Sequence, residues 1–213
     1  MRRILFEEWQ LGGINMSKNQ PIAKTRSLVL TAVFAALIIV MTVTPFLGYI
    51  SYGSIEITTL HIVTILGAVC LGPKKGAVIG AVWGLSCIAR AYFAFPVYLD
   101  FGFGNFFVSA LPRILVGLFA GAVFFALKKT KLPKAVSAIV ATVTGTLTNT
   151  VLVLSSMNLW SKFNDKDYSD AYTVIGNIFQ TLIGINGIIE LVAAVVIVPV
   201  IYSAISKALP ENA

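Results

Sequence analysis

Arg90 is the residue best suited to bind a charged ligand, because it ends an apolar run that continues into aromatic residues. A guanidinium donates hydrogen bonds in a planar fork that matches a carboxylate or a phosphate. Arginine and aromatic residues at the end of an apolar segment also anchor helices at a membrane surface. Both interpretations stay open, and the first makes Arg90, Tyr92 and Tyr98 candidate ligand-binding residues.

Neutral polar side chains recur within the other apolar runs, where they would add hydrogen-bond donors and acceptors to the same site. The asparagines among them are Asn105, Asn149 and Asn186. Each asparagine amide can both donate and accept a hydrogen bond. His61 is a further candidate ligand contact, although a histidine in such a run is more often a hydrogen-bonded packing residue.

Two charged residues, Arg113 and Glu190, lie deep within apolar runs. A charge in the hydrocarbon costs about 2.5–3.5 kcal/mol on insertion scales, so each needs a partner or a function. One interpretation pairs Arg113 with Glu190 across two helices as a structural ion pair. The alternative places one of them at a ligand cavity, where Asn186 would join Glu190 from one turn away on the same helix face.

Three common motifs of ATPases, metalloproteases and serine hydrolases do not occur in the sequence. There is no Walker A motif, no H-E-x-x-H and no G-x-S-x-G, and the single histidine cannot form a metal site with Cys70 and Cys87. Both cysteines fall within apolar runs, which favours buried thiols. A membrane enzyme or lipid-modifying protein with Glu190 and His61 as a catalytic pair is the alternative from another class, and the spacing does not favour it.

The elements that must position these residues are long apolar helices. Of 213 residues, 57% are hydrophobic and 12% are charged, about half the charge of an average soluble domain. Because a helix needs about 20 apolar residues to cross a bilayer, the sequence predicts an all-α integral membrane protein, a bundle of six transmembrane helices. The predicted spans are 27–46, 58–71, 77–91, 105–127, 135–154 and 174–204, of which the second is short.

Two connections between these spans have a recognisable character. The connection "LGYISYGSIEI" (47–57) alternates enough to form a short strand pair or an ordered loop. The polar stretch "SSMNLWSKFNDKDYSDAY" (155–172) is predicted to be the longest outer loop.

Basic residues gather in the connections on one side of the predicted bundle. Twelve of the sixteen lie there: Arg2, Arg3, Lys18, Lys24, Arg26, Lys74, Lys75, Lys128, Lys129, Lys131, Lys134 and Lys207. Since Lys and Arg stay on the cytoplasmic side, both the N- and C-termini are expected to be cytoplasmic. The charges separate apolar runs instead of forming a face, which argues against nucleic acid as a partner.

One membrane domain, residues 21–213, accounts for the apolar part of the chain, because six spans consume about 120 residues and leave short connections. Residues 1–20 are expected to form a cytosolic N-terminal extension without the shape of a signal peptide. Residues 1–15 could also be an overlong start assignment, since Met16 would itself serve as a start.

Small residues form stripes at four-residue spacing on three of the predicted helices. The stripes are Ala32 and Ala36; Gly76, Gly80 and Gly84; and Gly117 and Gly121. Residues at this spacing share one helix face and let two backbones approach closely. The glycine stripes are predicted to pack within the bundle. The alanine stripe is predicted to dock on a partner, because the first helix lies next to the positive turns.

Several motifs together resemble one known family. They are Ala32-x-x-x-Ala36, "LHIVTILGAVCLGPKKGAVIGAVWGL", "GNFFVSALPRILVGLFAG", "GTLTNTVLVL" and "GINGIIELVAAVVIVPVI". With these motifs the chain after Met16 resembles the substrate-binding S components of energy-coupling factor (ECF) vitamin transporters. It is most similar to the pantothenate type, from which Val63, Ile185 and Ile189 depart where Pro, Thr and Pro are expected.

The resemblance implies a bundle in the plasma membrane of a prokaryote that binds its vitamin near the extracellular face, beneath the outer loops. It also implies partners: a transmembrane coupling protein (EcfT-like) and two cytoplasmic ATPases (EcfA-like). These partners would use ATP and Mg²⁺, while this chain would bind no cofactor or metal and would not be an enzyme. Ala32 and Ala36 would dock on the coupling protein, and the bundle would topple in the membrane to release the vitamin.

The same resemblance assigns ligand contacts to Arg90, Asn149 and Asn186, and gives Arg113 of "PRILVG" a role in the fold more than in binding. Another vitamin on the same scaffold, such as cobalamin or riboflavin, remains an alternative to pantothenate. A carrier that works without ATPases is a further alternative.

Overall fold

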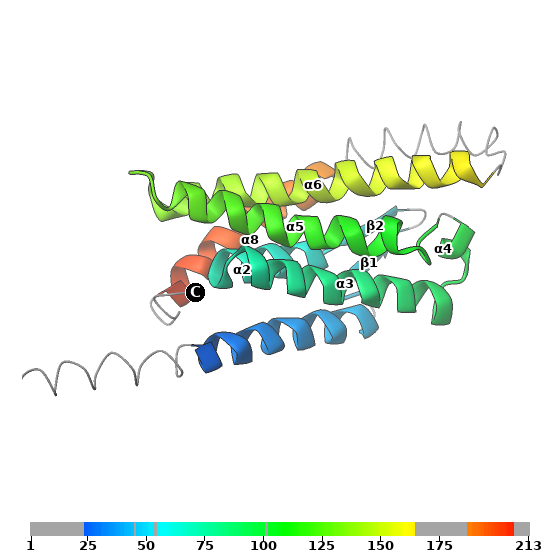
Figure 1. Ribbon diagram of the computed structural model, residues 1–213, viewed down its shortest axis with the longest axis horizontal. Helices are drawn as coiled ribbons and strands as arrows, with labels where there is room; N and C mark the ends of the chain where they lie inside the picture. Colours follow the sequence, from blue (N-terminus) through cyan, green and yellow to red (C-terminus); the bar gives the residue numbers. More distant parts are fainter. Residues whose placement is uncertain (1–23, 45, 53–54, 101, 165–186, 207–213) are drawn as a thin grey trace, which may run out of the picture.

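The computed structural model describes residues 24–44, 46–52, 55–100, 102–164 and 187–206. The expectations on residues 1–20, on Asn186, on the outer loop beyond 164 and on residues 174–186 of the sixth span therefore lie outside the described residues. The elements, in order, are a first helix (Lys24–Val43), β1 (Tyr49–Tyr52), β2 (Ile55–Thr58), α2 (Leu60–Leu71), α3 (Pro73–Phe93), α4 (Val97–Asp100), α5 (Phe106–Leu127), α6 (Lys134–Phe163) and α8 (Gly187–Ile205). The long helices run side by side as a bundle (Figure 1).

Five of the described helices are long and apolar enough to cross a bilayer: the first helix, α3, α5, α6 and α8. The predicted span at 58–71 corresponds to α2, which has only 12 residues. Such a helix is about 18 Å long, well short of the roughly 30 Å hydrocarbon layer. All twelve of its residues are buried, so α2 is a core helix enclosed by the longer ones. The fold is that of an all-helical membrane protein.

The glycine stripes join α3 to α5 inside the bundle, as predicted. A side chain at Gly80 would overlap the carbonyl of Arg113, and one at Gly84 would overlap the backbone of Ala110. Gly76 and Gly117 face each other in the same way. The two backbones therefore touch along the stripe, because missing side chains permit close approach. This contact fixes how far Arg113 lies from the residues of α3.

The C-terminal part of α6 differs from the prediction. Residues 155–163 were expected in an outer loop, but they continue the helix, which has 30 residues in all. The stretch contains no Gly or Pro to end a helix, and its polar side chains bond back to the helix: Ser156 donates to Val153 O at 2.9 Å and Ser161 to Asn158 O at 2.8 Å. The polar residues belong to a helix of about 45 Å, which is longer than the bilayer is thick, and not to a loop.

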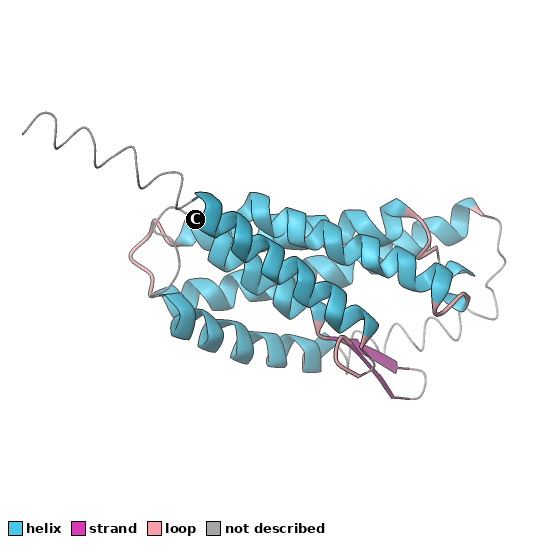
Figure 2. Cartoon of the chain, turned by 90° about the horizontal axis from the view of Figure 1, so that it is seen from below, coloured by secondary structure: helices cyan, strands magenta, loops and turns pink. Residues whose placement is uncertain are grey.

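The connection 47–57 forms the predicted strand pair. Strands β1 and β2 are antiparallel, with Tyr49 opposite Thr58 and Tyr52 opposite Ile55. Figure 2 shows the two strands beside one end of the helix bundle. That end, with the hairpin and α4, is called the hairpin end below.

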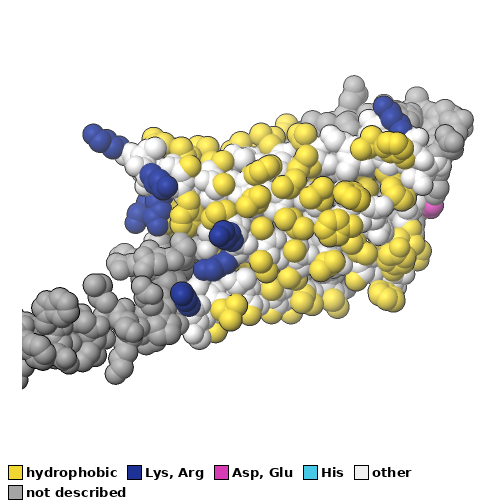
Figure 3. Space-filling view, in the orientation of Figure 1, with side chains coloured by type: hydrophobic (Ala, Val, Ile, Leu, Met, Phe, Trp, Pro, Cys, Tyr) yellow, Lys and Arg dark blue, Asp and Glu magenta, His cyan; other side chains and the backbone are white. Residues whose placement is uncertain are grey.

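The opposite end carries the positive turns and is called the lysine end: Lys74, Lys75, Lys128, Lys129, Lys131 and Lys134. On the face shown in Figure 3, Lys and Arg side chains gather mainly at this end, and hydrophobic side chains cover the middle. The Lys75 ammonium donates to the Ser27 hydroxyl, which ties the first helix to the start of α3. The alanine stripe lies on the side of the first helix that faces away from the bundle, because Ala32 and Ala36 are both exposed.

Candidate ligand-binding site

Arg90 lies at the hairpin end, next to aromatic rings from β1, from α4 and from the connection between α3 and α4. Its guanidinium carbon is 3.8 Å from the centre of the Tyr49 ring, 4.4 Å from that of Phe95 and 5.5 Å from that of Tyr98. Cation–π contacts of this kind contribute roughly 0.5–2 kcal/mol, more as water is excluded. They hold the guanidinium against the Tyr49 ring of the hairpin. Arg90 is half-buried, so its charge is partly screened by solvent.

Arg113 is a second cation at this end, and it is buried, with 6% of its surface exposed. Its Nη1 donates to Val108 O at 2.7 Å, and its guanidinium carbon lies 5.4 Å from the Trp83 ring and 5.6 Å from the Phe103 ring. Its Nε has no hydrogen-bond partner among the described residues, and neither has Nε1 of Trp83. Two buried N–H donors on neighbouring side chains are thus left for another group.

Tyr49 lies next to this pair of donors. Its hydroxyl is 3.1 Å from the Cys87 sulfur, and it comes close to the Trp83 indole without hydrogen-bond geometry. Removal from water, together with the Cys87 thiol, raises the pKa of the Tyr49 hydroxyl well above its ordinary value. The hydroxyl therefore stays neutral. Cys70 and Cys87 are buried free thiols, as predicted.

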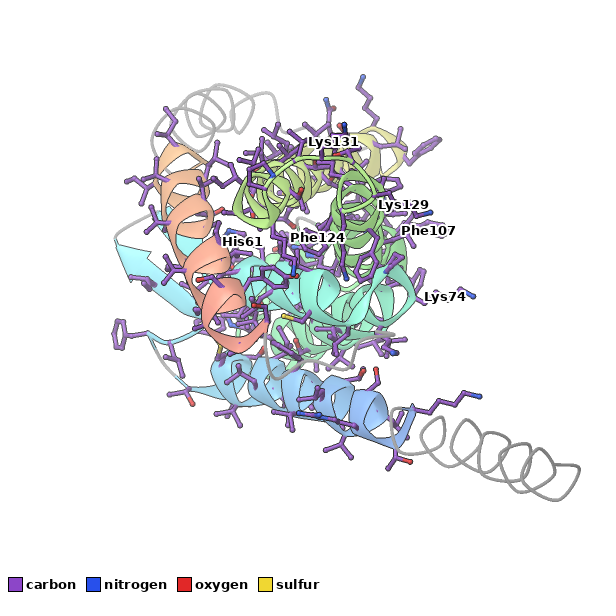
Figure 4. All side chains as sticks on the ribbon, turned by 90° about the vertical axis from the view of Figure 1, so that its left-hand side faces the viewer. His61, Lys74, Phe107, Phe124, Lys129 and Lys131 are labelled. Carbon is purple, nitrogen blue, oxygen red and sulfur yellow. The ribbon has the colours of Figure 1, made fainter. Side chains whose placement is uncertain are left out.

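His61 and Asn149 lie at one level of the bundle, deeper than the arginines. Gly145 of α6 packs on Ile65 of α2, and the two helices run in opposite directions. His61 and Asn149 are each four residues, one turn, from that contact toward the hairpin end. Figure 4 shows His61 among the central helices, while Lys74, Lys129 and Lys131 point outward.

Both residues carry buried polar atoms without partners. His61 is 0% and Asn149 8% exposed. Neither ring nitrogen of His61 has a hydrogen-bond partner among the described residues, although the backbones of Thr58 and Glu190 lie near. Oδ1 of Asn149 lacks a partner there too. Leaving such groups unpaired costs about 1–3 kcal/mol each, so each requires an explanation. A ligand that hydrogen-bonds to them provides one.

Glu190 lies in the first turn of α8 and links that helix to the hairpin. It is 8% exposed, and its Oε1 accepts a hydrogen bond of 2.7 Å from the backbone N–H of Thr58. Within the described part of the chain it does not pair with Arg113, which bonds to Val108 instead, so the proposed ion pair is wrong. Its carboxylate also forms no hydrogen bond to the His61 ring in that part, although the Glu190 backbone lies near the ring, so the catalytic pair of the enzyme alternative is not formed.

The remaining candidates are less closely tied to this cluster. Asn105 caps α5, accepting a 2.9 Å hydrogen bond from the Phe107 backbone, a contribution of about 1 kcal/mol to the helix. Tyr92 is 56% exposed and its hydroxyl lies near Gly104, whereas Tyr98 stacks on Arg90. Among the described residues no three of His, Cys, Asp or Glu are grouped closely enough to hold a metal ion.

The arrangement suits a small anion that also carries neutral polar groups. The two cations lie nearer the hairpin end, and the neutral set lies deeper. The buried carboxylate of Glu190 is already engaged by a backbone N–H. A carboxylate or phosphate would accept hydrogen bonds from the donors of Arg113 and Trp83 that have no partner among the described residues. Such charge-assisted hydrogen bonds are stronger than bonds between neutral groups. Hydroxyl or amide groups would complete those of His61 and Asn149.

Sequence reasoning did not identify Trp83, Thr146 or Tyr49 as members of this cluster. Trp83 and Thr146 are buried, with 1% and 2% of their surfaces exposed, and each has an unpartnered polar atom among the described residues. Both lie within motifs quoted for the family resemblance, "VWGL" and "GTLTNT". Their types gave no signal, since Trp and Thr are common packing residues in apolar helices.

Comparison with known proteins agrees with this description. Residues 26–202 match the family model of the ECF transporter substrate-specific component. A pantothenate transporter of Leuconostoc mesenteroides is 36% identical over 105 residues, which is 47% of this chain and 52%, about half, of that protein. A pantothenic acid transporter of Lactococcus lactis is 30% identical over 200 residues, covering 87% of this chain and 96% of that protein. Because the family model spans most of the chain, the protein is a member of the ECF transporter substrate-specific components, which are substrate-binding membrane subunits of transporters and not enzymes.

Proposed function

We propose that this protein captures pantothenate from outside the cell and delivers it inward as the S component of an ECF transporter. The observation that carries the proposal is a set of buried polar atoms with no partner among the described residues, in the half of the bundle toward the hairpin end, next to two arginines. Two relatives named as pantothenate transporters support the choice of vitamin. In this proposal the hairpin end faces outward and the lysine end faces the cytoplasm, as the positive-inside rule expects.

Pantothenate carries the kinds of polar group that could pair with the donors and acceptors of this cluster. It is an anion at neutral pH, with one carboxylate, one amide and two hydroxyl groups. The carboxylate would take the donors of Arg113 and Trp83, and Arg90 would attract it at the entrance. The amide and hydroxyl groups would pair with the neutral set that contains His61 and Asn149. Asn186 is proposed as a further contact from the resemblance.

Calorimetry with a panel of vitamins tests the choice of substrate. The purified protein is expected to bind pantothenate at micromolar concentration or below and to bind riboflavin and cobalamin at least about 100-fold more weakly, since neither presents a free carboxylate to a buried arginine. Binding of riboflavin or cobalamin in place of pantothenate would keep the family and overturn the substrate. A heat-denatured sample controls for adsorption to detergent.

The energy for transport is proposed to come from partners. The exposed stripe of Ala32 and Ala36 would dock on an EcfT-like coupling protein that carries two EcfA-like ATPases, which would use ATP and Mg²⁺. Support comes from the first helix, which is mostly exposed within the described structure, so much of its surface is open to lipid or protein. Two alanines one turn apart on the same helix face would let another helix approach closely.

Bulky substitutions on the stripe test this docking. Ala32→Leu and Ala36→Leu are expected to lower the amount of ATPase module that co-purifies by at least about tenfold, because leucine blocks close helix approach. Pantothenate affinity should stay within about twofold, since the stripe lies outside the bundle. Val33→Leu is the matched control, as it is exposed and lies about 100° around the helix. An unchanged complex after both alanine substitutions would contradict the docking surface.

A further inference from the structure

Thr146 is an exception among the threonines of α6. The hydroxyls of Thr142, Thr144, Thr148 and Thr150 each donate to the carbonyl four residues earlier, at 2.7–3.2 Å. This bond is the usual way for a threonine to satisfy its hydroxyl within an apolar helix. The Thr146 hydroxyl makes no such bond and has no partner among the described residues, although Thr146 is only 2% exposed.

The position of Thr146 puts it at the bottom of the cluster already described. It lies three residues from Asn149, on the same face of α6, and next to Gly145, where α6 meets Ile65. Gly145 also faces Ala120 of α5, so these contacts mark one level of the bundle. Thr146, Asn149 and His61 together present hydroxyl, amide and imidazole groups, with no formal charge on the first two.

The depth of the site can be compared with the length of the proposed substrate. Arg113 is seven residues from Ala120 toward the hairpin end, while Thr146 is one residue from Gly145. At 1.5 Å per residue, the two levels are about 9 Å apart. Extended pantothenate spans about nine bonds from carboxylate to terminal hydroxyl, as long as roughly three extended residues, or about 10 Å. One molecule can therefore reach both levels.

We infer that the Thr146 hydroxyl is a substrate contact, and that pantothenate binds with its carboxylate at Arg113 and its hydroxyl-bearing pantoyl end at Thr146, His61 and Asn149. The inference rests on the proposed function, and it adds an orientation and a specificity-determining residue. The pantoyl hydroxyls supply the partner that the Thr146 hydroxyl lacks. Vitamins without hydroxyl groups at this distance from an acid would leave it unpaired.

Thr146→Val tests the contact, because valine keeps the shape and removes the hydroxyl. Calorimetry is expected to show about five- to tenfold weaker binding of pantothenate, the effect of one neutral hydrogen bond. Thr142→Val is the matched control: Thr142 is buried on the same helix, but its hydroxyl is bonded to Ala138 O at 2.8 Å, and its affinity should change less than twofold. Thr146→Ser, which restores a hydroxyl, should regain most of the loss.

An analogue that lacks both pantoyl hydroxyls separates a contact from a packing effect. Wild type and Thr146→Val are expected to bind this analogue equally. Equal losses for pantothenate and the analogue, or an affinity for Thr146→Val no lower than for Thr142→Val, would overturn the inference while wild type still binds pantothenate. Failure of wild type to bind pantothenate would instead overturn the proposed function, and the inference with it.

Discussion

Replacing Arg113 with glutamine is expected to weaken pantothenate binding about 100-fold, because a pair of charge-assisted hydrogen bonds in a buried site contributes roughly 3 kcal/mol. Arg113 is buried, it has an unpartnered Nε among the described residues, and the unpaired Trp83 N–H lies beside it. Isothermal titration calorimetry of the purified variant measures the change, with thermal unfolding recorded on the same sample.

Two comparisons make this result specific to the carboxylate. Pantothenol, in which an alcohol replaces the acid, should bind wild type and Arg113→Gln with similar affinity. Arg90→Gln should cost less than about tenfold, because Arg90 is half-buried and its charge is partly screened. A larger loss at Arg90 than at Arg113, or an equal loss of pantothenol binding, would place the carboxylate elsewhere.

Gly80→Ala is expected to lower the melting temperature by about 5 °C or more and to weaken pantothenate binding. Alanine favours a helix by about 1 kcal/mol over glycine, but a Cβ at this position would overlap the Arg113 carbonyl. Backbone atoms cannot rotate away, so α3 and α5 must separate, at a cost of roughly 1–3 kcal/mol or more from overpacking. The same separation displaces Arg113 from Trp83. Thermal unfolding in detergent and calorimetry measure the two effects.

Val78→Ile is the control for this substitution, since it adds one carbon to the same helix at a position that is 53% exposed. Its melting temperature and affinity should match wild type. A Gly80→Ala variant as stable as wild type, with unchanged affinity, would show that the contact between α3 and α5 tolerates separation and does not position Arg113.

The helices and their packing could be predicted largely from the sequence. Apolar runs located every described long helix, alternation located the hairpin, and the four-residue glycine spacing predicted the contact of α3 with α5. Two features of the structure differ from the prediction. The polar composition of 155–163 predicts a loop, but the stretch lacks helix-ending residues and is helical. Helix α2 proved too short to span the bilayer, being enclosed by the other helices.

The candidate site was only partly predictable, because residue type does not report hydrogen-bond satisfaction. Arg90, Asn149 and His61 could be identified as polar groups in apolar runs. The sequence assigns Arg113 mainly to the fold. That its Nε lacks a partner among the described residues becomes evident only in the packed structure. Thr146 is the same residue type as the other threonines of α6, so the sequence does not distinguish it from them. It differs only in where its hydroxyl lies, and that depends on tertiary structure.

A structure of the protein with pantothenate bound tests the central claim most directly. We expect the ligand in the half of the bundle nearer the hairpin end, with its carboxylate on Arg113 and its pantoyl hydroxyls within hydrogen-bond distance of Thr146 and Asn149. Pantothenate bound at the lysine end, or with its carboxylate directed to His61 and away from Arg113, would contradict this account.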